Sequence, residues 1–401
     1  DDVYGQCVMF QNQLLMVDGG IPRKCTSAYT VSNLSADANM PQDSTAIWVH
    51  RDKVWLNSQA NPMIAYFCTT NSANGATSWT GTTDAGTINL STILPEGDTI
   101  VGFRSVGGYG SNQIAIICRK YTVVFQATSN VYAFQLIQYF PTTCASINAT
   151  DYLGTDLVYP SLNSFTSLAL QVAGNNLEVK SLSDYIQPLW RSTVALFTDT
   201  TQIAAGYDKT LNLFYITFPT SSSPQIFVYS IDIGNFVGRY TYPFTVYSFK
   251  YRLSGQMLMG ADGYVYIMNT GTSDDGTAIS FKYASPAYYL GTASRYKKPI
   301  EFEALFQNTA NLTAYLDYWY GLANLATDLI SKEITLTASS SPWDTSLWDV
   351  SYWDASGNNL FKTADLLGRG KLMFIEIRHS TLDSLLAMAY YIVRYKMEGT
   401  K

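Results

Sequence analysis

The stretch that decides the fold is residues 255–268, Gly-Gln-Met-Leu-Met-Gly-Ala-Asp-Gly-Tyr-Val-Tyr-Ile-Met. Two largely apolar runs, 255–260 and 264–268, flank the dipeptide Asp262-Gly263. Asp-Gly between such runs indicates a tight hairpin turn, because both central residues of that turn need a positive φ angle. The segment therefore predicts two antiparallel β-strands joined by a two-residue turn.

The same pattern of short strands recurs through most of the chain. Runs rich in β-branched and aromatic residues are separated by Gly, Asn, Asp, Ser and Thr roughly every 8 to 14 residues. The clearest further runs are 6–10 with 13–17, 46–49 with 53–56, and 211–218 after a turn at 207–210. Helical periodicity has room for a turn or two at 181–189 and 322–329. We therefore predict an all-β protein.

The runs in the first part of the chain group into six rough units. Their period of about 45 residues is typical of four-stranded propeller blades, although they carry no Trp-Asp blade signature. The pattern favours a β-propeller over a β-sandwich for residues 1–285. The units are 5–45, 46–95, 97–148, 149–195, 198–248 and 249–285.

The pattern changes after about residue 285. Longer runs alternate apolar and polar residues, which predicts strands with one buried face. These runs are 299–306, 312–319, 331–337, 371–378 and 386–395. We predict two domains, a β-propeller-like domain over residues 1–285 and a C-terminal antiparallel β-sandwich over residues 286–401.

Charge is scarce in this chain. Its 401 residues include 25 Lys+Arg and 31 Asp+Glu, so 14% are charged where an ordinary domain has about 25%. The hydrophobic content of 47% excludes intrinsic disorder, and the net charge of −6 disfavours a basic nucleic-acid-binding protein. The apolar stretch at 385–393 is far shorter than the roughly 20 residues that cross a bilayer, so we expect no membrane-spanning segment.

The reactive residues favour no catalytic or metal site. The only two histidines, His50 and His379, lie far apart, no Gly-x-Ser-x-Gly motif occurs, and the seven Glu form no evident pair. Cys68 and Cys118 lie in apolar runs and are expected to be buried. Asp274-Asp275-Gly276 is interpreted as a turn, since the rest of a calcium loop is absent. We predict no catalytic residues, no cofactor and no metal.

Tryptophan recurs every five residues between two strands of the predicted sandwich. Trp343, Trp348 and Trp353 are each followed by Asp. Two interpretations stay open for this repeat. The rings form a contact with another subunit or an adaptor protein, since Trp concentrates binding energy at interfaces, or they fold back onto their own sandwich.

This Trp-Asp repeat lies between Leu-Asp-Tyr-Trp-Tyr-Gly at 316–321 and Leu-Gly-Arg-Gly-Lys at 367–371. Together these segments resemble the C-terminal region of the tail nozzle proteins of short-tailed phages, also called packaged-DNA stabilisation or tail-tube-tip proteins. The resemblance covers roughly residues 46–399 and depends on the order of the motifs. A departure is the segment at 141–146, which lacks the glycine of the family's turn. The upstream segments that follow the family's order are 98–103, 112–117, 134–136, 154–159, 181–188, 228–232 and 273–279 leading into 289–291.

The resemblance implies a structural virion protein located in the phage tail. The family has a β-propeller and a β-sandwich platform and forms a hexameric ring that extends the portal-adaptor channel, retaining packaged DNA and letting it exit during ejection. The implied partners are further copies of the chain, portal-adaptor proteins, tail fibre or tip proteins, and DNA that passes through the lumen without specific binding. We expect an acidic or polar lumen, because repulsion of phosphate keeps the wall from holding the DNA.

Aromatic residues are the candidates for contacts between subunits. We predict interface positions at Tyr288, Tyr289, Tyr296, Trp343, Trp348 and Trp353. The alternative function is that of an extracellular carbohydrate-binding or glycoside-hydrolase β-propeller. A hydrolase would need a pair of carboxylates about 5 to 9.5 Å apart, and a lectin would stack exposed aromatic rings on sugars.

Overall fold

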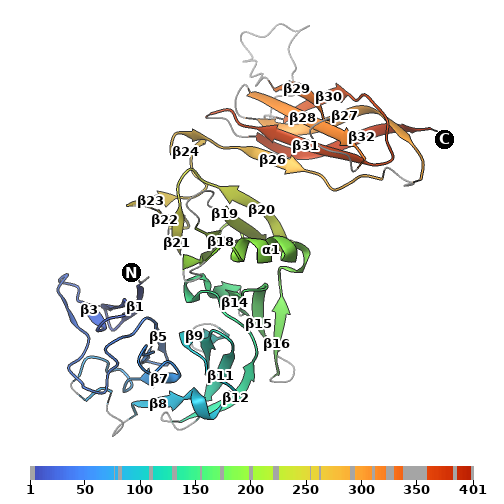
Figure 1. Ribbon diagram of the computed structural model, residues 1–401. Coiled ribbons are helices and arrows are strands. Elements are labelled where there is room, and N and C mark those ends of the chain that lie inside the picture. The colour runs from blue at the N-terminus through green and yellow to red at the C-terminus, as the bar shows by residue number, and fades with distance from the viewer. Residues whose placement is uncertain are drawn as a thin grey trace. The chain divides into compact units, whose positions relative to one another are not determined.

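The computed structural model describes most of the chain (Figure 1). The described residues are 5–75, 77–79, 84–107, 112–128, 133–153, 156–171, 176–197, 202–219, 225–252, 254–261, 263–289, 294–308, 312–321, 329–336, 359–382 and 386–398. Among the described residues, nearly all regular secondary structure is β-strand, as the sequence predicts.

Two compact units make up the chain, Asp1–Asn269 and Thr270–Lys401. The boundary lies earlier than the expected division at 285/286. The reason is strand β26 (Phe281–Ala284), which pairs with β31 (Met373–His379) and so belongs to the C-terminal unit. The basic run Arg295-Tyr-Lys-Lys298 lies inside that unit, and its Lys297 is buried.

The N-terminal unit contains six small antiparallel sheets in its described part, and in each sheet the strands follow in chain order. The first sheet is β1 (Gln6–Phe10), β2 (Gln13–Val17), β3 (Arg23–Cys25) and β4 (Val31–Asn33). The second is β5 (Ile47–His50), β6 (Lys53–Leu56), β7 (Ile64–Phe67) and β8 (Gly86–Asn89). The third is β9 (Ile100–Val106), β10 (Gln113–Cys118), β11 (Thr122–Ala127) and β12 (Phe134–Phe140).

The remaining sheets of this unit continue the pattern. The fourth is β13 (Asp151–Leu153), β14 (Asp156–Pro160), β15 (Phe165–Gln171) and β16 (Asn176–Ser181). The fifth is β17 (Ala204–Asp208), β18 (Leu213–Phe218), β19 (Gln225–Ser230) and β20 (Asn235–Thr241). The sixth has three strands, β21 (Val246–Tyr251), β22 (Met257–Ala261) and β23 (Tyr264–Ile267). The predicted units match these sheets closely, except that the sixth sheet begins at Val246, before residue 249.

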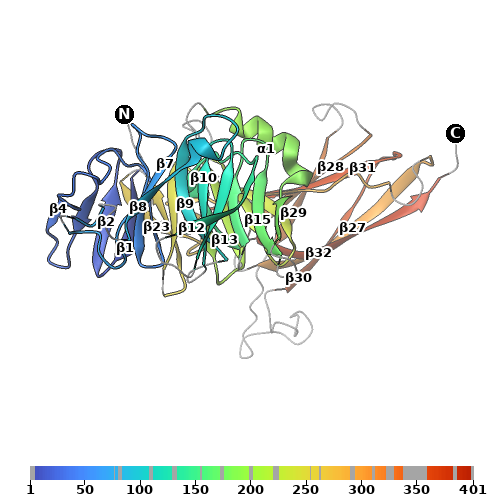
Figure 2. The ribbon, with the colours of Figure 1, turned by 90° about the horizontal axis from the view of Figure 1, so that it is seen from below.

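The first strands of the sheets gather around one axis. β1 contacts β5, β5 contacts β9, β13 contacts β17, and β17 contacts β21. A cavity of about 260 Å³ is lined by the first strands of five sheets and by Asn148, just before β13. Figure 1 shows the sheets following one another around an arc, and Figure 2 shows their strands standing side by side. The unit is therefore a β-propeller, and each sheet is one blade with its first strand innermost.

Apolar residues of this propeller are buried between neighbouring blades. Trp55 of blade 2 packs with Phe103 of blade 3, and Val158 of blade 4 packs with Phe214 of blade 5. Each inter-blade cluster buries large side chains that contribute roughly 1.5 to 3 kcal/mol each. Cys68 and Cys118 are buried in these clusters, as the sequence predicts.

Helical structure is sparse. The α-helix α1 (Gln187–Val194) follows the short 3-10 helix η3 (Asp184–Ile186), which confirms the short helical segment predicted near 181–189. Two further 3-10 helices are η1 (Leu90–Thr92) and η2 (Ile147–Ala149). Among the described residues, no helix has the length and hydropathy needed to span a membrane.

The C-terminal unit is a β-sandwich that shares one core between two antiparallel sheets. One sheet has the order β26-β31-β28-β29, with β28 (Leu312–Tyr320) and β29 (Ile330–Leu336). The other has the order β30-β27-β32, with β30 (Asn359–Asp365), β27 (Lys297–Asn308) and β32 (Leu386–Met397). A small hairpin, β24 (Ser273–Asp274) with β25 (Thr277–Ala278), turns through Asp275 and Gly276 at positive φ angles, which confirms the turn predicted there.

Candidate functional site

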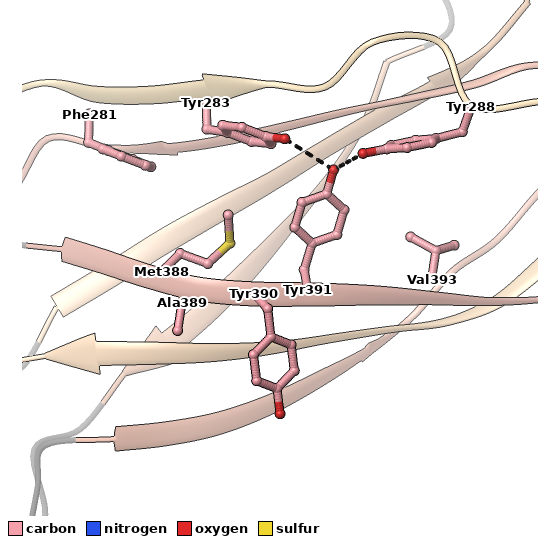
Figure 3. A pocket seen from close by; sticks show the side chains of 8 residues that line it. All are labelled: Phe281, Tyr283, Tyr288, Met388, Ala389, Tyr390, Tyr391 and Val393. Atoms are coloured by element: carbon pink, nitrogen blue, oxygen red, sulfur yellow. Dashed lines mark hydrogen bonds between the residues drawn. The ribbon is translucent and has the colours of Figure 1, made fainter. Parts of the chain in front are cut away.

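A large cavity lies at one side of the β-sandwich. On one side of the unit, β29 and β30 are in contact. The edge strands of the two sheets at the other side are β26 and β32, and between them lies a cavity of about 680 Å³ (Figure 3). Its lining residues are Phe281, Tyr283, Tyr288, Met388, Ala389, Tyr390, Tyr391 and Val393. We call this cavity the tyrosine pocket.

Three tyrosine hydroxyls meet at the centre of this pocket. The Tyr391 hydroxyl lies 3.3 Å from that of Tyr283 and forms a second, short hydrogen bond with that of Tyr288 (Figure 3). The Tyr391 ring also stacks on Phe302, with ring centroids 5.7 Å apart. Burial raises the pKa of Tyr391, and its hydrogen bonds to Tyr283 and Tyr288 raise it further. The hydroxyl group is therefore neutral at physiological pH.

The tyrosine pocket is suited to binding uncharged groups. Its lining residues include no carboxylate, no imidazole, no Lys or Arg side chain and no thiol. Pockets of 300 to 1,000 Å³ with apolar walls and a few polar groups are typical of binding sites. This pocket fits apolar side chains or another uncharged group, and it supplies hydroxyls for one or two hydrogen bonds.

Two of the predicted interface residues lie beside this pocket. Tyr288 lines it, and the backbone of Tyr288 forms an isolated bridge with Met373 in β31. Tyr289 follows and is 53% exposed. The meeting of Tyr283 and Tyr391 with Tyr288 was not predicted.

The other predicted interface residues do not join this pocket. Tyr296 is half-buried, with the Lys371 ammonium 5.3 Å and the Arg369 guanidinium 6.0 Å from its ring centroid. Trp343, Trp348 and Trp353 lie outside the described residues. Their role at an interface stays a prediction.

The centre of the propeller holds a second, smaller cavity. Arg104 from β9 reaches into it and lies over the Trp48 ring at 4.5 Å, donating a 3.0 Å hydrogen bond to the Ile147 carbonyl. Gln6 accepts from the Ile47 amide at 3.2 Å and donates to Asn148 at 3.4 Å. These bonds tie four of the innermost segments together. At about 260 Å³, the cavity is smaller than most ligand pockets.

A buried histidine, His50, shares a hydrogen-bond partner with Trp48, which lines this cavity. His50 Nδ1 is 2.9 Å from the Ser105 hydroxyl, which also accepts from the Trp48 indole at 3.2 Å. Its Nε2 has no hydrogen-bond partner among the described residues. Burial, with the nearby Arg51 cation, lowers the pKa of His50 to about 4, so the ring is neutral at pH 7.

The buried cysteines offer no activated thiolate. Burial raises the pKa of Cys68 to about 11 and that of Cys144 to about 12. A thiol with so high a pKa is a weak nucleophile at neutral pH. No group of three or more His, Cys, Asp or Glu side chains in the described ranges is arranged to hold a metal ion.

Similarity to known proteins is found only among solved structures. No protein-family model matches it, and no curated relative matches it. The computationally designed Ika8 protein aligns with a TM-score of 0.41 at 11% identity over 65% of this chain and 69% of that chain. The WD40 domain of Neurospora crassa Pan2 aligns at 0.40 and 11% over 66% and 75%, and Kuenenia stuttgartiensis hydrazine synthase at 0.41 and 10% over 65% and 75%. The likenesses are distant, and the propeller assignment depends on the strand contacts of this chain itself.

Proposed function

We propose that this chain is a structural subunit of the tail nozzle of a short-tailed phage. The observation that carries the proposal is the domain order. A propeller of residues Asp1–Asn269 is followed by a β-sandwich of Thr270–Lys401, and this is the pair of domains that the sequence resemblance implies. In this proposal, further copies, portal-adaptor proteins and tail fibre or tip proteins surround the chain in the virion.

The propeller cavity bears on where DNA would pass. Its volume of about 260 Å³ and its crossing side chains leave no room for a duplex whose major groove alone is about 12 Å wide. A DNA channel therefore has to be enclosed by several copies of the chain. This requirement agrees with a ring, in which each copy contributes part of the wall.

The net negative charge of the ring would help it to release DNA. Each chain carries a formal charge of −6, so six copies bring about −36 to the ring. A wall of the same sign as phosphate offers DNA no specific contact, and the duplex slides under the pressure that drives ejection. Retention before ejection would then depend on a closed tip.

The enzyme alternative receives less support from the cavities. Neither the tyrosine pocket nor the propeller cavity has an Asp or Glu among its lining residues. Retaining and inverting glycoside hydrolases both need two carboxylates at the bond that breaks. An extracellular carbohydrate-binding propeller remains the second candidate, and glycan arrays address it directly.

Negative-stain electron microscopy of the purified chain, across concentrations from nanomolar to tens of micromolar, tests the proposal. We expect closed rings with six copies, and the same rings at the tail tip of virions when labelled with an antibody to this chain. Single propellers at every concentration, together with no label on virion tails, would contradict it. Binding of a defined glycan in the absence of rings would favour the carbohydrate-binding alternative.

A further inference from the structure

Exposed cations gather around the first residues of β27 in the β-sandwich. Elsewhere in this unit Lys282, Arg378 and Arg394 each form an ion pair with a carboxylate, at nitrogen–oxygen distances of 2.5 to 2.8 Å. The cations near the start of β27 form no ion pair with a carboxylate of the described residues, apart from the buried Lys297, of which no such statement is made. We call this group the basic corner. Its exposed members are Arg295, Lys298, Arg369, Lys371 and Lys396, and the buried Lys297 lies among them.

Backbone pairing brings three segments of the chain together at this corner. Lys298 lies opposite Lys396 in the register of β27 with β32. The amides of Lys297 and Gly370 donate to each other's carbonyl oxygens at 2.9 and 3.0 Å, and the Lys297 ammonium donates to the Lys371 carbonyl at 3.3 Å. Burial and the nearby Lys371 ammonium lower the pKa of Lys297, as expected for like charges held close together. Six of the chain's 25 Lys and Arg thus lie at one corner of a protein whose net charge is −6.

The loop that carries Arg369 is fixed by Tyr320. The Tyr320 hydroxyl donates a 2.6 Å hydrogen bond to the Leu367 carbonyl. Gly368 and Gly370 lie so close to Tyr320 that a Cβ added at either would be only 2.5 or 2.7 Å from its side chain. Gly368 also has a φ angle of 98°, which favours glycine. The backbone that presents the cations is therefore held in place by packing.

The acidic residues on the same strands do not balance these cations. Glu301 and Glu303 on β27 lie 3.7 and 2.6 Å from the Arg394 guanidinium. Asp365 lies opposite Glu301, and Glu398 follows the end of β32. None of these four carboxylates is within ion-pair distance of an exposed cation of the basic corner. An anion from outside the chain would therefore supply the missing negative charge.

Two large apolar side chains are exposed beside the cations. Ile300 is 51% and Leu367 is 59% exposed, and the Leu366 amide joins their segments through a 2.8 Å hydrogen bond to the Ile300 carbonyl. Lys298 and Ile300 are both exposed and flank the buried Pro299, so they lie on the same side of the strand. The surface thus combines cations with apolar groups.

We propose that the basic corner is a binding surface for a bilayer of anionic phospholipids. Lipid phosphates would contact the exposed cations, and Ile300 and Leu367 would enter the boundary between the head groups and the acyl chains. Duplex DNA also carries phosphates, but contacts to its backbone would leave both apolar side chains in water. The inference goes beyond the proposed nozzle role and does not depend on ring formation.

Flotation of the purified full chain with lipid vesicles tests this inference. One set of vesicles is phosphatidylcholine alone, and the other contains about one third phosphatidylglycerol. We expect the chain to float with the anionic set, and its affinity to fall by roughly tenfold or more between about 0.1 M and about 1 M salt, because salt screens exposed charges. Equal binding to both sets would overturn the inference, and so would no binding to either.

A charge variant locates the binding surface. Lys298→Gln, Lys371→Gln and Lys396→Gln together remove three exposed cations from the basic corner. We expect the affinity for anionic vesicles to fall by roughly 100-fold, since each cation near an anionic surface contributes about fivefold. The thermal midpoint should not change, because all three side chains are exposed.

The matched control removes three exposed cations from the propeller and so changes the net charge equally. Its substitutions are Arg119→Gln, Arg191→Gln and Arg252→Gln. We expect this control to keep its affinity for anionic vesicles within about threefold, because charges far from the lipid surface are screened. Equal losses in the two triple variants would overturn the assignment to the basic corner.

An apolar variant separates a bilayer from DNA as the partner. Leu367→Ser should weaken binding to anionic vesicles by about tenfold, because the leucine no longer leaves water. Ile233→Ser is the control, since Ile233 is 70% exposed on the propeller, and it should leave binding unchanged. Equal affinities for the two serine variants would overturn the inference, and so would displacement of the chain from vesicles by duplex DNA at equal phosphate concentration.

The vesicle assay and the search for rings give independent results. A chain that binds anionic vesicles but forms no rings supports this inference and contradicts the nozzle proposal. Rings that do not bind anionic vesicles overturn this inference and leave the nozzle proposal intact.

Discussion

The propeller and the sandwich bury their apolar residues in different ways. In the propeller, separate clusters lie between neighbouring blades, such as the one that joins blades 4 and 5 around Trp190. In the sandwich, a single cluster fills the space between two sheets and includes Phe302. A destabilising substitution in the propeller should therefore affect mainly one pair of blades, whereas one in the sandwich should affect the whole unit.

Removal of a fully buried tryptophan gives the largest expected effect on stability. Trp190 is fully buried, and its indole donates a 3.1 Å hydrogen bond to the Ser161 carbonyl. Trp190→Ala should cost about 3 to 5 kcal/mol of propeller stability. In hydrogen exchange the loss of protection should concentrate in blades 4 and 5. Phe302→Ala is the counterpart, and it should raise exchange throughout the sandwich. Uniform exchange across the propeller in Trp190→Ala would contradict the comparison.

Acid should weaken the propeller through His50. Its pKa is about 4 in the folded chain against 6.5 in the unfolded chain, so below pH 6.5 the unfolded state binds the proton first. The stability is full above pH 6.5 and falls as the pH drops toward 4, by up to about 3 kcal/mol. Urea unfolding of the propeller at pH 7 and pH 4.5 measures the effect.

The control for this pH dependence is a side chain that cannot be protonated. His50→Gln should have lower stability at pH 7, but the difference between pH 7 and pH 4.5 should shrink. An equal pH dependence in both proteins would show that other groups cause it.

Adding a side chain where two blades pack closely should have an intermediate effect on stability. A methyl group added at Gly102 in β9 would lie 2.2 Å from the Ile147 side chain, which is itself buried. Gly102→Ala should cost about 1 to 3 kcal/mol, because the close-packed neighbours must shift. Gly97 has open space around it, so Gly97→Ala is the matched control. Equal thermal midpoints for the two variants would contradict this description.

The smallest expected effect is in the tyrosine pocket. Tyr391→Phe removes the hydroxyl that joins Tyr283 and Tyr288, and it leaves the ring stacked on Phe302. We expect a loss of about 1 kcal/mol from the sandwich alone. Differential unfolding of the two units measures it. Tyr390→Phe, a change at an exposed ring, should have no effect on stability.

Local signals made much of the propeller predictable. The hairpin around Asp262-Gly263 was predicted from its two residues, and β22 pairs with β23 as expected, with Gly263 at a φ angle of 74°. This signal comes from residues that are adjacent in the sequence. The same holds for the blade spacing, since each blade is a run of consecutive strands.

Features that depend on pairing between strands far apart in the sequence were not predictable in the same way. The four residues of β26 look like one more propeller strand until they are paired with β31, which is why the domain boundary was misplaced. β30 was missed, and its partner β27 lies more than 50 residues earlier. The meeting of Tyr283, Tyr288 and Tyr391 depends on the packing of two sheets, and alternation alone cannot give it.

The central claim is that copies of this chain join into a ring, and native mass measurement of the purified chain at micromolar concentration tests it most directly. The account predicts an assembly of six 44.5 kDa chains, about 267 kDa. A mass of 44.5 kDa at every concentration, or a dimer of about 89 kDa that does not grow, would contradict it.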